Sequence, residues 1–209
     1  DRPGFIGLDR FKVGGVNVIA DMDAPYLPFG DNCFDLVLSV HSLEHVANLI
    51  GVMREIWRVA KPGSQVVVVA PYSTALLDDA NPYHLQKFNE HSPRFWTDVQ
   101  SSFVDPAEWV EPPLGKMWGL ASSDNREPGL DLRCIRMEFL YFKEYWMMSP
   151  KKQRRYRKRR FNVCEQIMYH LVVFKSPMTD EDVVTAAESM ELYVPDLIEQ
   201  RRALRRTRG

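Results

Sequence analysis

The sequence predicts an α/β fold with a doubly wound, mostly parallel sheet in three layers and an antiparallel strand at the sheet edge. Two observations carry this prediction. Short apolar runs that end in polar residues recur along the first third of the chain, and a segment of helical period separates the third run from the fourth. Strand, helix and strand joined by short connections imply a parallel sheet with right-handed crossovers.

The first two predicted strands are short, and each ends in a carboxylate. Residues 5–9 read Phe-Ile-Gly-Leu-Asp, and residues 16–21 read Val-Asn-Val-Ile-Ala-Asp. Gly14-Gly15 between them reads as a hairpin or connecting turn. A turn-rich linker then leads to a nearly continuous apolar run at residues 34–40, which we expect to be a strand covered on both faces.

An amphipathic helix is predicted over residues 42–60, where apolar side chains recur at spacings of three and four before Lys61-Pro62-Gly63. A buried strand follows at residues 65–70. The later signals are weaker. They favour two strands, at residues 133–142 and 165–174, and the second is expected to be antiparallel at the sheet edge. They also favour four helices, at residues 93–101, 150–160, 179–192 and 195–206.

The composition is that of a folded globular protein, with 45% hydrophobic and 26% charged residues in a chain of 209. The longest purely apolar run, Val66 to Ala70, is far too short to span a bilayer, and no signal-peptide pattern is present. We therefore expect a soluble, cytoplasmic protein. Its three cysteines match no zinc or redox spacing and are expected to be free thiols.

A dense basic run hides behind the net charge of -1. Residues 151–160 hold eight basic side chains and no acidic one. Such a run is usually a solvated helix face, although it also attracts anionic partners.

Polar residues follow the predicted strands at the edge where ligands bind in an open parallel sheet. These are Asp9, Asp21 with Met22, and residues 39–41. A carboxylate after one strand accepts both hydroxyls of a ribose, and one after the next strand accepts an adenine amino hydrogen. A single Asp at a strand end more often caps a turn, but two at matching positions favour a ligand site.

An ordered series of short motifs runs through residues 5–71. The motifs are Ala20-Asp21-Met22, Leu27-Pro28-Phe29, Asp31-Asn32-Cys33-Phe34-Asp35, Leu43-Glu44-His45-Val46, Glu55, Arg58-Val59 and Lys61-Pro62-Gly63. In order and spacing the series resembles the signature of small class I S-adenosylmethionine-dependent methyltransferases of the type 11 group. The resemblance implies a seven-stranded, Rossmann-like sheet with S-adenosyl-L-methionine as cofactor.

The cofactor-binding residues that this resemblance implies lie at strand ends: Gly7, Asp9, Asp21, Met22, Ser39, Val40 and His41. Asp9 would hold the ribose and Asp21 with Met22 the adenine, while residues 39–41 would lie beside the methionine part.

The resemblance also implies a domain organisation. Residues 1–176 would form the methyltransferase domain, with acceptor-side insertions at about 72–145, and residues 177–209 a C-terminal helical extension. Such enzymes begin with a strand and a Gly-x-Gly turn, which nothing before Asp1 supplies. We therefore expect about 20 to 40 further residues at the N-terminus of the native protein.

His41-Ser42-Leu43-Glu44-His45 also matches His-x-x-Glu-His, a zinc-peptidase pattern. That chemistry needs both histidines on one face of a helix, together with a distant carboxylate. Because His41 ends a predicted strand and only His45 begins the helix, we expect no metal. Glu44 is instead expected at the positive end of the helix dipole.

Histidines are the candidates for a catalytic base. Methyl transfer to a hydroxyl needs in-line attack on the sulfonium methyl, and a nearby histidine takes the proton. His84 ends an Asn-Pro-Tyr-His element in the loop after the fourth strand, a region that similar enzymes use to cover the cofactor and meet the acceptor. We place His84 first, with His41 and His91 behind it. The alternative is that His84 fixes the loop through a backbone hydrogen bond.

Three functions stay open. The leading one is O-methylation of a sugar, glycan or other small metabolite, because no nucleic-acid module is recognisable. The second is an RNA- or DNA-directed methyltransferase that uses the basic segment 151–160, where aromatic interleaving is thin. The third is a catalytically inactive methyltransferase-like binding subunit. The sequence does not fix the oligomeric state, and a homodimer stays open.

Overall fold

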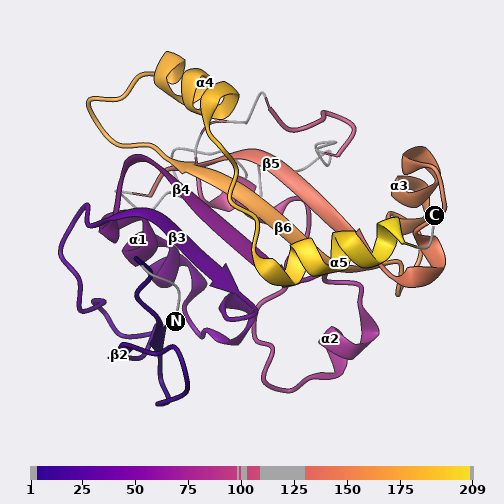
Figure 1. Ribbon diagram of the computed structural model, residues 1–209, viewed down its shortest axis with the longest axis horizontal. Helices are drawn as coiled ribbons and strands as arrows, with labels where there is room; N and C mark the ends of the chain where they lie inside the picture. The colour runs from indigo at the N-terminus through magenta and orange to yellow at the C-terminus, as the bar shows by residue number, and fades with distance from the viewer. Residues whose placement is uncertain (1–3, 98, 100–102, 109–129, 208–209) are drawn as a thin grey trace.

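The computed structural model describes residues 4–97, 99, 103–108 and 130–207. Strands, helices and short 3-10 turns follow one another along this part of the chain (Figure 1): β1 (Leu8–Asp9), β2 (Val18–Ile19), β3 (Phe34–Val40), η1 (Leu43–His45), α1 (Leu49–Val59), β4 (Ala60–Pro71), α2 (Leu76–Ala80), η2 (Ser92–Phe95), β5 (Leu132–Tyr141), η5 (Lys143–Tyr145), α3 (Pro150–Arg157), β6 (Cys164–Val173), α4 (Asp180–Ser189) and α5 (Asp196–Arg206).

The main sheet of the described residues has four strands in the order β3-β4-β6-β5. β3 pairs parallel with β4, whereas β6 pairs antiparallel with β4 and with β5, so β3, β4 and β5 run in one direction. The prediction of an α/β fold with a mostly parallel sheet is confirmed. The antiparallel strand, which was expected at the edge, lies one position inside it, because β5 pairs with its outer side.

β1 and β2 form a separate two-stranded parallel sheet. Gly14 and Gly15 between them make the expected turn, and because the strands are parallel it is a connecting turn and not a hairpin. Figure 1 shows β2 below the main sheet. Apolar side chains of this small sheet and its flanks stay exposed, among them Ile6 at 52% and Ile19 at 61%. The strands of the described residues therefore form two separate sheets, and β2 does not pair with β3.

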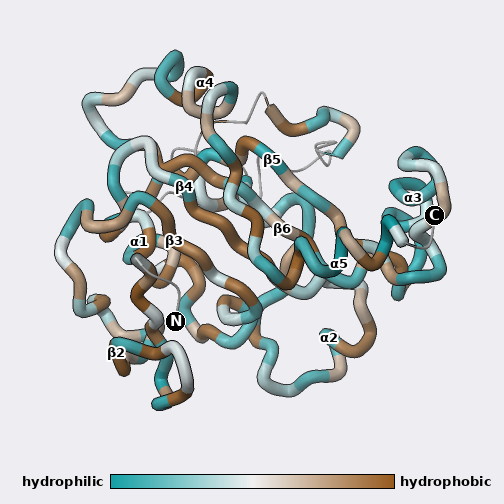
Figure 2. Tube along the Cα trace, in the orientation of Figure 1, coloured by the Kyte–Doolittle hydropathy of each residue, from teal (hydrophilic) through white to brown (hydrophobic). Residues whose placement is uncertain are grey.

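Helices cover both faces of the main sheet, with α1 behind it and α5 in front in Figure 1. The side chains of β4 alternate between the two faces. Val66, Val68 and Ala70 join the core cluster that contains α1, whereas Val67 and Val69 join the cluster that contains α5. Figure 2 shows hydrophobic residues concentrated along β4 and β6. The predicted three-layer arrangement is thus confirmed.

β3 is less covered than the sequence predicted. Ser39 is its one buried residue, and most of the other side chains are half-buried. The physical reason is its position, because β3 is an edge strand of the main sheet whereas β4 is flanked on both sides.

The predicted helix over residues 42–60 is divided in two. α1 begins at Leu49, because the Asn48 side chain accepts a hydrogen bond from the Gly51 amide at 2.9 Å and so caps the helix there. Residues 43–45 form the separate turn η1. The expectation that Glu44 lies at the N-terminus of this helix is therefore wrong.

The C-terminal helices agree with the sequence. Thr179 and Asp182 form the expected capping box at the start of α4, and α5 follows Pro195 directly. α3 covers most of the predicted basic helix. Of the predicted helix at residues 93–101, the turn η2 is present, and residues 98, 100 and 101 lie outside the described residues. No helix in the described chain has the length and apolarity to cross a membrane.

Candidate active site

The carboxylates at the ends of β1 and β2 lie where the sequence placed them. Asp9 accepts a hydrogen bond from the Phe11 amide at 2.8 Å through Oδ1. Asp21 accepts one from the Asp23 amide at 3.0 Å and one from the Arg10 guanidinium at 2.8 Å. The hydrogen bond from Arg10 lowers the pKa of Asp21 below its ordinary value. Both acids therefore fix local turns, and Asp9 keeps its second oxygen without a partner among the described residues.

Gly7 has a structural reason to be glycine. Its amide donates to the Asn17 side chain at 2.8 Å, and its carbonyl accepts from the backbone amides of Asn17 and Val18. A Cβ atom at Gly7 would lie 2.0 Å from the carbonyl oxygen of Gly15. Close approach of two backbone segments thus accounts for this residue.

Asp23 ties the loop after β2 to the connection between β3 and α1. Its carboxylate accepts hydrogen bonds from the Ala47 amide at 3.0 and 2.9 Å and from the Asn48 amide at 2.9 Å. Met22 packs against the main core. The loop that carries the predicted adenine-side residues Asp21 and Met22 is therefore held beside the start of α1, through an aspartate that the sequence analysis did not single out.

The end of β3 carries an unusual backbone. His41 has φ of +51°, a left-handed conformation that costs free energy for a residue with a side chain. Its amide donates to the Val69 carbonyl at 2.9 Å, which extends the parallel ladder into the turn. Just before it, the Ser39 hydroxyl is buried and has no hydrogen-bond partner in the described part of the chain.

His84 is held by a carboxylate that the sequence analysis missed. Its Nδ1 lies 2.5 Å from Oδ1 of Asp78, which is itself only 5% exposed. Oδ2 of Asp78 lies 3.4 Å from the Lys87 ammonium. The ring is presented by a turn, since the His84 amide donates to the Asn81 carbonyl at 3.1 Å. This pairing orients the imidazole and leaves Nε2 for chemistry.

The loop that carries His84 is fastened to η1. The amides of Leu85 and Gln86 both donate to the Glu44 carbonyl, at 2.7 and 3.0 Å. The rings of His45 and His84 consequently meet, with centroids 4.7 Å apart. On the other side, His41 Nδ1 lies 3.4 Å from a carboxylate oxygen of Glu44. Two of the three predicted base candidates, His41 and His84, therefore belong to one cluster around Glu44.

His91 lies apart from that cluster, in the loop before η2. Its amide donates to the Asn89 side chain at 2.8 Å, and Arg94 donates to its Nδ1 at 3.4 Å. Burial lowers the pKa of His91, and the nearby cations act in the same direction. Glu90 next to it is buried and paired with Arg157. His91 is thus tied to a structural ion-pair network.

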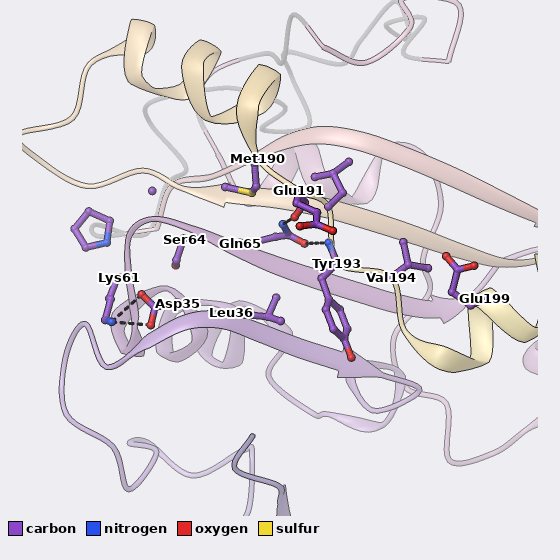
Figure 3. Close-up of a pocket in the computed structure, with 13 residues that line it drawn as sticks. Asp35, Leu36, Lys61, Ser64, Gln65, Met190, Glu191, Tyr193, Val194 and Glu199 are labelled. Carbon is purple, nitrogen blue, oxygen red and sulfur yellow. Dashed lines mark hydrogen bonds and ion pairs between the residues drawn. The ribbon is translucent and has the colours of Figure 1, made fainter. Parts of the chain in front are cut away.

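A hollow of about 790 Å³ lies at the opposite end of the strands (Figure 3). It is lined from one side by Asp35, Lys61 and Gln65, near the amino ends of β3 and β4, and from the other by residues 190–194 and Glu199. Gln65 closes it by accepting a hydrogen bond from the Tyr193 amide at 2.9 Å. None of the predicted site residues lines this hollow.

Comparisons with known proteins find methyltransferases similar to the first third of the chain. The sequence model of the family described as a methyltransferase domain matches residues 3–68. The matched segment contains every residue that the sequence analysis predicted to bind the cofactor.

Individual methyltransferases match the same part of the chain. Sterol 4-C-methyltransferase strm-1 of Caenorhabditis elegans is 35% identical over 82 residues, which cover 38% of this chain and 25% of that protein. The ubiquinone/menaquinone biosynthesis C-methyltransferase UbiE of Cupriavidus pinatubonensis is 38% identical over 65 residues, covering 31% of this chain and 27% of that protein. The chain spans about a quarter of the length of these two methyltransferases.

Among solved structures, a SAM dependent methyltransferase from Archaeoglobus fulgidus is similar, with 16% identity and a TM-score of 0.46. The similarity covers 80% of this chain and 75% of that chain.

Proposed function

We propose that the protein transfers the methyl group of S-adenosylmethionine to a hydroxyl group of a sugar, a glycan or another small metabolite. The match of residues 3–68 to the methyltransferase family supports the donor. The pairing of His84 with Asp78 at 2.5 Å is the observation that supports a hydroxyl acceptor. A hydroxyl must lose a proton when it attacks a methyl group, and an imidazole held by a carboxylate accepts one.

Two groups at the strand ends that lack a hydrogen-bond partner among the described residues suit the cofactor. The free oxygen of Asp9 is available to a ribose hydroxyl, and the buried Ser39 hydroxyl is available to the methionine part. By this proposal Asp21 and Met22 bind the adenine, and Val40 and His41 line the methionine side. Gly7 contributes through close backbone packing.

The bound cofactor supplies an electrophilic methyl group on its sulfonium. Asp78 accepts the Nδ1 hydrogen of His84, so the neutral ring exposes the Nε2 lone pair and takes up the acceptor's proton there. Asp78 then stabilises the imidazolium that results. Hydrogen bonds from Leu85 and Gln86 to the Glu44 carbonyl hold the loop of His84 at η1, which supports a proton acceptor near the strand ends proposed to bind the cofactor.

The basic segment 151–160 does not motivate a nucleic-acid substrate. Arg157 is fully buried and paired with Glu90 and Glu108, and Arg154 is paired with Glu108. Two of the eight cations of the run are thus paired with acids of the protein, and one of them, Arg157, is buried. The C-methyltransferase names of the two relatives do motivate a sterol and a quinone in the acceptor panel, since a carbon acceptor is the main competing chemistry.

The test is methyl transfer from radiolabelled S-adenosylmethionine to a panel of sugars, glycans, phenols, a sterol and a quinone. With a hydroxyl acceptor, we expect His84→Asn and Asp78→Asn to lower kcat by about 10²- to 10⁴-fold, because each change disables proton transfer. Asp79→Asn, an exposed acid next in sequence to Asp78, is the matched control and keeps the activity.

Calorimetric titration of the same variants with S-adenosylmethionine separates catalysis from cofactor binding, and we expect unchanged affinity. Wild-type kcat in both His84→Asn and Asp78→Asn would contradict the role of this pair. Labelling of a carbon atom of the sterol or the quinone, with no label on any hydroxyl oxygen, would contradict the hydroxyl acceptor.

A further inference from the structure

We propose that Glu44, His45 and His84 form a binding site for a divalent transition metal of the Zn²⁺ class. One ligand nitrogen of each imidazole and one carboxylate oxygen of Glu44 all lie within 4.8 Å of one another. Ligand atoms that share a tetrahedral Zn²⁺ lie about 3.4 Å apart, given bonds of about 2.0 to 2.1 Å. Small side-chain rotations therefore suffice to close the three groups around an ion.

Both imidazoles are already oriented as metal ligands usually are. His84 Nδ1 faces the Asp78 carboxylate at 2.5 Å, and His45 Nδ1 faces the Tyr83 carbonyl at 3.0 Å. A carbonyl and a carboxylate only accept hydrogen bonds, so each Nδ1 carries the hydrogen and each Nε2 carries a lone pair. A carboxylate or carbonyl behind a ligating histidine fixes its tautomer and raises its basicity.

Glu44 supplies the second, independent observation. Its side chain is 1% exposed, and Oε2 has no hydrogen-bond partner in the part of the chain that the structure describes. The other oxygen lies 3.4 Å from His41 Nδ1. A buried carboxylate oxygen without a partner in the described chain calls for an explanation, and a cation bound by the Glu44 carboxylate and the two imidazoles provides one.

The backbone holds the three ligands in place from two distant segments. Glu44 and His45 belong to η1, and His84 belongs to the loop that donates two amide hydrogen bonds to the Glu44 carbonyl. His45 is exposed, so an ion reaches the site from solvent. The donor set is two histidines and one carboxylate with an open position, which suits Zn²⁺ and is unsuited to Mg²⁺, an ion that prefers oxygen ligands.

This site differs from the zinc-peptidase pattern that the sequence suggested and that we expected not to bind metal. His41 and His45 do not share a helix, because His41 directly follows β3 and has a left-handed backbone. The partner of His45 is His84, 39 positions along the chain, which no sequence spacing indicates. The inference does not depend on methyl transfer, although a bound ion and a proton would compete for the same His84 nitrogen.

The test uses protein without a histidine tag, stripped with a chelator and titrated calorimetrically with Zn²⁺ and, separately, with Mg²⁺. Co²⁺ binding is followed by visible absorption, which reports nitrogen and oxygen ligation. We expect one Zn²⁺ per chain and no heat with Mg²⁺. His45→Asn and His84→Asn should each weaken Zn²⁺ binding by more than about 100-fold, and Asp78→Asn, which acts behind His84, by about 10- to 100-fold.

Three matched variants are expected to keep wild-type Zn²⁺ affinity: Asp79→Asn beside Asp78, His91→Asn outside the cluster, and Cys33→Ser, which removes the exposed thiol. Far-UV circular dichroism of the metal-free proteins verifies folding, and Glu44→Gln gives a third ligand variant if one histidine variant does not fold. Absence of Zn²⁺ binding to the wild type would overturn the site. Binding that survives in His45→Asn and His84→Asn, or is lost in Cys33→Ser, would do the same.

Discussion

The side chains that fix the candidate site are mostly acids that accept hydrogen bonds from a loop. Asp23 holds the start of α1 beside the loop after β2, and Asp78 holds His84. Glu55 does the same for the linker after β2: its carboxylate accepts from the Leu27 amide at 2.7 Å and from two nitrogens of Arg58. These residues position others and are expected to affect stability before chemistry.

Glu55→Gln is predicted to destabilise the protein by about 1.5 to 3 kcal/mol at pH 7, the usual worth of hydrogen bonds to a charged group. The hydrogen bond from Arg58 holds the pKa of Glu55 below its ordinary value. The stabilisation that the Glu55 carboxylate contributes is therefore complete at pH values above its pKa in the unfolded chain. It is lost as the pH falls through the lower pKa of Glu55 in the folded protein. Urea unfolding of both proteins across pH 3 to 7 measures the difference.

Asp35→Asn is the control for that series, because its ion pair with Lys61 leaves the Asp35 side chain 82% exposed. We expect Asp35→Asn to change the free energy of unfolding by close to zero. If the difference in free energy of unfolding between the wild type and Glu55→Gln stays constant or increases on acidification, the role of the Glu55 charge is contradicted.

Among the elements, α3 shows how a basic run is divided between interior and surface. Arg157 is buried against Phe139, with its guanidinium 3.6 Å from the ring centroid, and it donates to Glu90 at 2.5 Å. Tyr72 donates to the same carboxylate at 2.6 Å. Burial alone would raise the pKa of Glu90, yet Arg157 and Tyr72 hold it below the ordinary value. α3 therefore docks through a charge network.

Arg157→Met is predicted to lower the free energy of unfolding by about 3 to 5 kcal/mol, because it removes a buried cation that pairs with Glu90 and Glu108. Arg155→Met on the exposed face of the same helix should change stability by less than about 0.5 kcal/mol. The free energy of unfolding in urea checks both values. Equal effects of the two substitutions would show that Arg157 is not the docking residue.

At the scale of the whole molecule, the sequence indicated those elements that can be recognised from the apolar residues within a single segment. β4 and the buried face of α1 follow directly from runs and spacings of apolar residues. The break before Leu49 was missed, because it depends on the Asn48 cap and on Asp23, 25 positions away from that cap. The cluster of Glu44, His45 and His84 was missed for a similar reason, since tertiary contacts bring it together.

β1 and β2 form a sheet separate from the four-stranded sheet of β3 to β6 in the described residues, and the sequence did not indicate this separation. The domain boundaries at residue 176 and the expected N-terminal residues stay predictions. The intact mass of the native protein measures the second directly.

The central claim, that the carboxyl ends of β1 to β3 bind S-adenosylmethionine, is tested most directly by calorimetric titration of the protein with that cofactor. We predict one molecule bound per chain, with affinity reduced about tenfold or more by Asp9→Asn, which removes a charged hydrogen-bond acceptor. Asp35→Asn, at the opposite end of the strands, should leave the affinity unchanged. Absence of binding to the folded protein, or equal affinity in the Asp9→Asn variant and the wild type, would contradict the claim.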